Sequence, residues 1–74
     1  MNVVRLPIRH EPYGGKMHVW REGEDGFLVV HEGASANSFG NLRRFGNHER
    51  DTAIAYALAE MPGYAPCSIG RVDQ

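Results

Sequence analysis

Four histidines and one cysteine are the side chains of this 74-residue chain best suited to proton transfer or nucleophilic attack near neutral pH. His10, His18, His31 and His48 stand in no Ser–His or Cys–His pattern typical of nucleophilic catalysis. Cys67 lies far along the chain from all of them and is interpreted as a plain buried thiol. A chain of this length also has little volume for a deep pocket. We therefore predict that the protein is not an enzyme and uses no cofactor.

Two of the histidines could share a metal ion if the segments that carry them pair as a hairpin. In one of two registers, His18 and His31 are direct cross-strand neighbours with Cβ atoms about 5 Å apart. A structural zinc site needs four ligands, however, and the only nearby acids are Glu22 and Glu32, without a CxxC or HxxxH spacing. We therefore interpret the two histidines as half-exposed side chains of a sheet and predict no metal site.

The densest positive group of the chain combines arginines with an aromatic residue at positions 43–50. Arginine beside an aromatic ring can stack on nucleic-acid bases or pair with phosphates, and the same residue types anchor protein interfaces. On an exposed strand these arginines could also simply be solvated or paired with nearby glutamates. The predicted partner-binding residues are Trp20, Phe39, Arg43, Arg44, Phe45 and Arg50.

The charge balance limits the classes of partner. Lys plus Arg is 8 and Asp plus Glu is 9, which gives a formal net charge of -1. This disfavours, without excluding, a protein whose affinity comes from phosphate contacts, and it excludes a polybasic membrane anchor. No apolar run approaches the roughly 20 residues that span a bilayer, and Arg5 and Arg9 interrupt any signal-peptide core. We expect a cytoplasmic protein without a leader and without membrane contact.

The clearest structural signal is a β-hairpin at about residues 16–32. Two β-rich runs, 16–22 and 27–32, are separated by Gly-Glu-Asp-Gly, which is typical of a tight turn. The register is open by one residue, with Trp20 opposite Val29 in one alternative and opposite Val30 in the other. Since residues 27–30 are all apolar and one helix covers only one face, the uncovered face is predicted to form a homodimer or a partner interface.

Three weaker patterns flank the hairpin. Residues 3–9 alternate like a strand, but Pro7 limits them to a sheet edge, and 67–72 form a possible final strand. A short third strand is predicted at 41–45, with Leu42 on one face and Phe45 on the other.

A single helix is predicted at about residues 48–61. Asn47 is a good N-cap, acidic residues follow in the first turn, and a Pro-Gly pair at 62–63 stops the helix. Apolar residues recur at helical spacing on one face, at Ile54, Ala57, Leu58 and Met61. Of these, Ile54, Leu58 and Met61 are predicted to pack against Trp20, Val30 or the residues that the alternative register puts in their place.

The whole chain, 1–74, is thus predicted as a single small α+β domain, an antiparallel sheet of three to four short strands packed against one C-terminal helix. This order and size resemble those of double-stranded-RNA-binding domains and of small phage or plasmid proteins, including some anti-CRISPR inhibitors. The second helix and lysine-rich helix start of the RNA-binding domains are missing here. The analogy and the near-neutral charge favour a protein-binding regulator or inhibitor; the alternative is a nucleic-acid-binding module using Arg43, Arg44 and Phe45.

Overall fold

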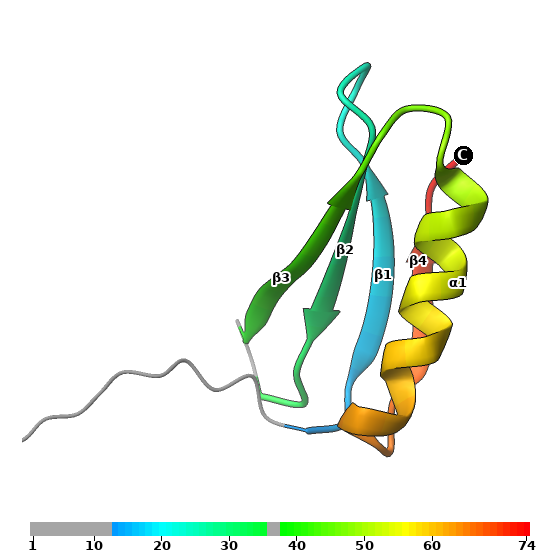
Figure 1. Ribbon diagram of the computed structural model, residues 1–74. Helices are drawn as coiled ribbons and strands as arrows, with labels where there is room; N and C mark the ends of the chain where they lie inside the picture. The colour runs from blue at the N-terminus through cyan, green and yellow to red at the C-terminus, as the bar shows by residue number, and fades with distance from the viewer. Residues whose placement is uncertain (1–12, 36–37) are drawn as a thin grey trace, which may run out of the picture.

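The computed structural model describes residues 13–35 and 38–74, which form one sheet with a helical layer on one of its faces (Figure 1). The predicted edge strand at 3–9 lies outside the described residues. In chain order the elements are β1 (Lys16–Arg21), β2 (Phe27–Glu32), β3 (Phe39–Phe45), α1 (Arg50–Glu60), the 3-10 helix η1 (Met61–Tyr64) and β4 (Ser68–Val72).

The sheet has the strand order β3-β2-β1-β4. Strands β1, β2 and β3 are antiparallel neighbours, whereas β4 pairs with β1 in parallel. The parallel pairing follows from α1 and η1, which carry the chain back along the sheet before β4 begins (Figure 1). The predicted α+β class with one C-terminal helix is confirmed, and the predicted final strand joins the sheet as a parallel edge.

The hairpin of β1 and β2 has a register that neither sequence-based alternative predicted. Trp20 lies opposite Leu28, one or two residues earlier on β2 than expected. The turn sets this register: the Glu22 N–H donates to the Gly26 carbonyl at 2.8 Å, which closes the turn between these two residues. Gly26 adopts a φ of 127°, and a Cβ there would lie 2.1 Å from the Phe45 carbonyl oxygen, so the position requires glycine.

The helix-facing side of the sheet supplies most of the bulk of the core. Large apolar side chains from the three antiparallel strands meet small ones from α1, and all are at most 8% exposed. Because the sheet residues are large, the helix approaches closely through alanines. The buried cluster consists of Met17, Val19, Phe27, Val29, Phe45, Ala53 and Ala57.

The predicted buried face of the helix is confirmed in part. Ala57 is buried, and Ile54 and Met61 are half-buried and pack against the core, as predicted, whereas Leu58 is 52% exposed. The second buried residue of α1 is Ala53, so the small residues of the helix lie nearest the sheet. Of the predicted packing partners, Trp20 and Val30 belong to the opposite face of the sheet, and the register alternative Val29 lies in the core.

The start of the helix also differs from the prediction. The first residue of α1 is Arg50 and its N-cap residue is Glu49, which makes no side-chain capping hydrogen bond. The side chain of Asn47, the predicted cap, instead accepts a hydrogen bond from Arg21 at 2.7 Å. The chain continues as a 3-10 helix through Pro62 and Gly63 before it turns into β4.

Strand β3 contains an irregularity that changes which side chains share a face. Its pairing with β2 shifts between Val29 and Val30, so that Leu42 is an extra residue without a partner across the ladder. Leu42 therefore packs against the same core as Phe45, and the prediction that these two residues lie on opposite faces is wrong.

Candidate binding surface

The sheet face that points away from α1 is called the open face here. The register places on it alternate side chains of the three antiparallel strands. One row of side chains across the strands consists of Trp20, Leu28 and Arg44. The next row consists of His18, Val30 and Asn41. Glu32 and Phe39 lie opposite each other at the end of the sheet.

Aromatic rings form the most prominent feature of the open face. The ring centroids of His18 and Trp20 are 5.6 Å apart, and those of Trp20 and Phe39 are 5.9 Å apart. Phe39 is 50% exposed, but Leu28 and Val30 are only 8% and 0% exposed although α1 does not cover them. The expected patch of exposed aliphatic residues at 27–30 is therefore wrong, because all of those residues are buried and the open face presents aromatic rings instead.

The charges of the open face are locally balanced. The Arg44 guanidinium donates two hydrogen bonds to the Glu22 carboxylate, at 2.8 and 3.3 Å, while its side chain stays 63% exposed. At the other end of the face, Glu32 Oε1 lies 2.8 Å from His18 Nε2. Because an exposed ion pair such as that of Arg44 with Glu22 contributes little stability, it leaves Arg44 available to a binding protein.

Both ring nitrogens of His18 are in use. The backbone N–H of Arg71 donates to His18 Nδ1 at 2.9 Å, so Nδ1 must carry a lone pair. The proton of the neutral ring is then on Nε2, which donates it to Glu32. In this arrangement His18 ties β4 to β1 and β2, and it has no free nitrogen for a metal ion or for general-base catalysis.

The predicted pairing of His18 with His31 does not occur, because the observed register places them on opposite faces of the sheet. His31 pairs with Met17 and is 0% exposed beneath the helix layer. Its Nε2–H donates to the Gly14 carbonyl at 2.7 Å, and its ring centroid lies 4.1 Å from that of Tyr64. Within the described part of the chain, no group of three or more His, Cys, Asp or Glu side chains could hold a metal ion.

The single cysteine has an environment that works against a reactive thiolate. Burial raises the pKa of the Cys67 thiol above its usual value. Its Sγ lies 3.8 Å from the Ser68 carbonyl oxygen. A nucleophilic cysteine requires the opposite shift, which a nearby cation or a helix N-terminus would produce.

The six residues predicted to contact a partner are divided among three places. Trp20, Phe39 and Arg44 share the open face. Arg43 and Phe45 belong to the helix side, where the Arg43 guanidinium lies over the rings of Phe45 and Tyr56 at 5.3 and 5.8 Å, and Phe45 is buried. Arg50 begins α1, and its Nε donates to the backbone carbonyl of Asp73.

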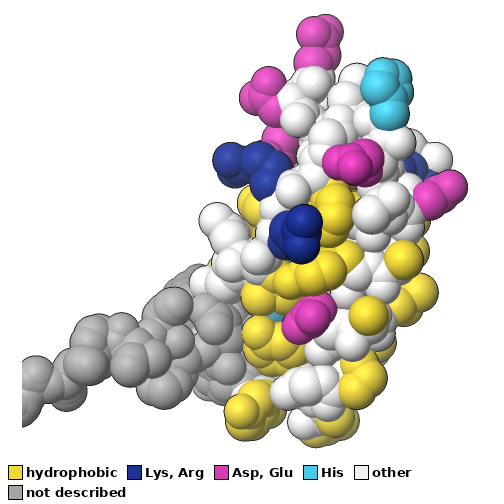
Figure 2. All heavy atoms as spheres, in the orientation of Figure 1, with side chains coloured by type: hydrophobic (Ala, Val, Ile, Leu, Met, Phe, Trp, Pro, Cys, Tyr) yellow, Lys and Arg dark blue, Asp and Glu magenta, His cyan; other side chains and the backbone are white. Residues whose placement is uncertain are grey.

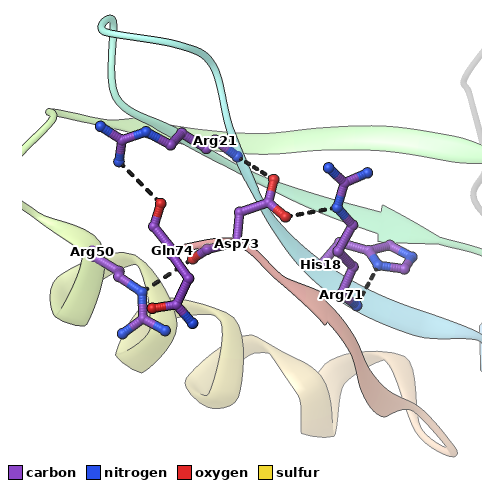
Figure 3. Close-up of polar contacts among 6 residues, drawn as sticks. All are labelled: His18, Arg21, Arg50, Arg71, Asp73 and Gln74. Atoms are coloured by element: carbon purple, nitrogen blue, oxygen red, sulfur yellow. Dashed lines mark hydrogen bonds and ion pairs between the residues drawn. The ribbon is translucent and has the colours of Figure 1, made fainter.

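A hydrogen-bond network around Asp73, drawn in Figure 3, is the polar cluster that the sequence did not predict. Arg21 donates its backbone N–H to Asp73 Oδ2 at 2.8 Å, and Arg71 donates its Nε–H to Oδ1 at 2.7 Å. Arg50 Nε donates to the Asp73 carbonyl at 3.0 Å. The side-chain bond from Arg71, followed by the Arg21 backbone bond, lowers the pKa of Asp73. The network fixes the residues after β4 against β1 and the start of α1.

No protein family model matches the chain, and comparison with curated proteins and with solved structures likewise finds no match. No helix among the described residues has the length and apolar character required to cross a bilayer. Any functional conclusion therefore depends on the geometry of the described residues.

Proposed function

We propose that this protein is a non-enzymatic protein-binding module that regulates or inhibits its partner by occupying part of the partner's surface. The observation that carries the proposal is the contact between the rings of Trp20 and Phe39 on the open face, which also carries Arg44. A sheet holds these side chains in fixed positions, so little conformational entropy is lost when they become part of an interface.

The residue types on this face favour a protein partner. Trp and Arg are the residue types enriched among interface hot spots, and Phe is enriched in interfaces generally. Phe39 is 50% exposed and lies next to the half-buried Trp20, so a partner can contact both aromatic rings at once. The pairing of Arg44 with Glu22 keeps the local charge near neutral. Such a surface suits the apolar centre of a protein interface better than a phosphate backbone.

Two further observations support a binding role over a catalytic one. His18 uses both of its ring nitrogens in hydrogen bonds that hold the sheet together. Burial raises the pKa of the Cys67 thiol and so disfavours the thiolate. In keeping with its size and layout, we place the protein in the cytoplasm and in a phage or plasmid context.

A nucleic-acid-binding module is the second candidate. Aromatic side chains on an open sheet face, with arginine beside them, are a common platform on which unpaired bases stack. Trp20 and Phe39 form such a pair of rings, and Arg44, on the same strand as Phe39, shares the open face with them, whereas Arg43 lies on the helix side. The formal net charge of -1 weighs against this candidate, because phosphate contacts normally supply most of the affinity for nucleic acid.

Quantitative capture from cells of the source organism, followed by mass spectrometry and nuclease treatment, tests the proposal. We expect the capture to retain a protein. Phe39→Ala and the double variant Arg43→Ala, Arg44→Ala should each lower the affinity for this protein at least tenfold. The affinity should fall only slightly as the salt concentration rises. Leu58→Ala is the matched control, since Leu58 is 52% exposed on the helix layer. Nuclease-sensitive capture with a steep salt dependence, or a turnover abolished by changing His18, would overturn the proposal.

A further inference from the structure

Strand β3 has seven residues and, among the described residues, a neighbouring strand on one side only. Every second backbone N–H and C=O group of such an edge points away from the sheet, where another extended segment can pair with it. The far edge of the sheet is shorter, because β4 has five residues, and its pairing with β1 is irregular. Within the described residues, β3 is thus the longer of the two edges that can accept a further strand.

The helix layer leaves the β3 side of the core incompletely covered. Helix α1 packs mainly against β1 and β2, while Leu42 and Tyr56 on the β3 side are only partly buried. Figure 2, in the orientation of Figure 1, shows hydrophobic side chains exposed between the sheet and α1, with one Lys or Arg side chain and one Asp or Glu side chain among them. A strand added beside β3 would lay alternate side chains over this margin and bury it further.

The charges along this edge favour an acidic segment. Arg43 forms no ion pair with any described acidic residue, and its guanidinium lies over the rings of Phe45 and Tyr56 at the margin of the core. Arg44 points to the open face and remains 63% exposed despite its contact with Glu22. The edge therefore presents an arginine on each of its two faces, and a carboxylate on the added strand can reach either one.

A second copy of this chain is a poor occupant of the same edge. When two β3 strands pair around a two-fold axis centred on the irregularity, Leu42 and Arg43 of the two copies lie opposite each other. The two Arg43 side chains would then lie close together without an acidic partner, and like charges that face each other across a ladder are destabilising. Adjacent arginines and a bulge are devices that commonly prevent edge-to-edge pairing.

We infer that the partner contributes an extended acidic segment that adds to the sheet as a fifth strand beside β3. The inference deepens the proposed function, on which it rests. Backbone hydrogen bonds supply affinity, and specificity comes from Arg43 with the apolar margin formed by Leu42, Phe45 and Tyr56. Phe39 extends the contact onto the open face.

The test measures fluorescence anisotropy with labelled octapeptides of alternating sequence. The peptides carry Val and the charged residue on the same face of the strand, as a contact with both the margin and Arg43 requires. We expect acetylated (Val-Thr-Glu-Thr)2 to bind at least tenfold more tightly than (Val-Thr-Lys-Thr)2, and Arg43→Glu to reverse this preference. Arg43→Gln, which removes the charge with a smaller disturbance, should abolish the preference. Lys16→Glu is the matched charge control, because it lies on β1 away from the β3 edge, and it should leave the preference unchanged. Equal binding of the acidic and basic peptides to the parent protein would overturn the inference.

N-methylated peptides separate strand addition from charge attraction alone. Two versions of (Val-Thr-Glu-Thr)2 are compared, one methylated at every Val and Glu nitrogen and one at every Thr nitrogen, so that each blocks one edge of the peptide. Loss of binding with one version and retention with the other is expected, whereas equal retention with both contradicts strand addition. If none of the peptides binds, but Phe39→Ala still weakens the binding of a captured protein, this inference is wrong and the proposed function stands. If sedimentation shows that the parent protein self-associates through β3, the inference of an acidic segment is wrong, and the occupant of this edge is a second copy of the chain.

Discussion

Ala57→Leu tests the orientation of α1, on which the division of the sheet into a core face and an open face depends. Ala57 is 0% exposed, so a larger side chain must displace Met17 or its neighbours in the buried cluster. Overpacking of this kind costs about 1–3 kcal/mol. A small domain has about 0.05–0.15 kcal/mol of stability per residue, so this cost is a large fraction of the total. Urea unfolding, followed by the fluorescence of Trp20, should show a lower midpoint with an unchanged slope.

Two neighbouring positions provide the controls for this experiment. Ala59→Leu makes the same chemical change at an exposed position and should alter the free energy of unfolding by no more than about 0.5 kcal/mol. Leu58→Ala should cost less than about 1.5 kcal/mol because half of that side chain is already in water, whereas the sequence-based helix orientation implies about 2–5 kcal/mol. A larger loss from Leu58→Ala than from Ala57→Leu would show that the described orientation is wrong.

Two further predictions concern β4. Gly70→Ala should destabilise the fold by about 1–3 kcal/mol, because its Cβ would lie 2.5 Å from His18 Cε1, and by less in a His18→Ala background. Arg71 and Arg21 lower the pKa of Asp73, so its carboxylate stabilises the fold above the pKa of unfolded aspartate, about 3.9, and this contribution is lost as the pH falls through the lowered folded-state pKa. Asp73→Asn should therefore weaken the acid dependence of the melting temperature; an unchanged slope below about pH 4 would contradict this account.

The elements with strong local signals could be predicted from the sequence. The Gly-Glu-Asp-Gly turn marked the β1–β2 hairpin, and a helical pattern ended by Pro62 marked the helix. Both signals depend on residues close together in the chain, where turn geometry and helix propensity act directly. The order of the elements and the α+β class follow from such signals.

The arrangement of the side chains could not be predicted in the same way. Leu58 is exposed and Ala53 is buried because the bulk of Met17 and Phe27, far away in the sequence, fills the space between the layers. Single residues also decide which side chains share a face of the sheet. The turn at Gly26 sets the hairpin register, and the extra residue Leu42 changes the alternation of side chains along β3. The alternation of apolar residues does not reveal such one-residue shifts.

The predicted contact residues show the same limit. Trp20 lies in β1 and Phe39 in β3, and only the pairing of β2 with both of these strands brings their rings to 5.9 Å. The bond from Arg21 to Asp73 joins positions 52 residues apart and has no local signature. Residue types indicated which side chains could bind a partner, but the fold decides which of them can do so together.

The contact between His18 and Gly70 limits how the sequence of this fold can change. The imidazole occupies the space that any side chain at position 70 would need, and it also receives the backbone hydrogen bond from Arg71. Substitutions at these two positions should therefore be accepted together more readily than separately. Other chains with this strand order are expected to have a histidine in the first strand together with a glycine in the last, or to have both residues replaced. This pair would indicate the shared architecture even where sequence identity is too low to reveal a relationship.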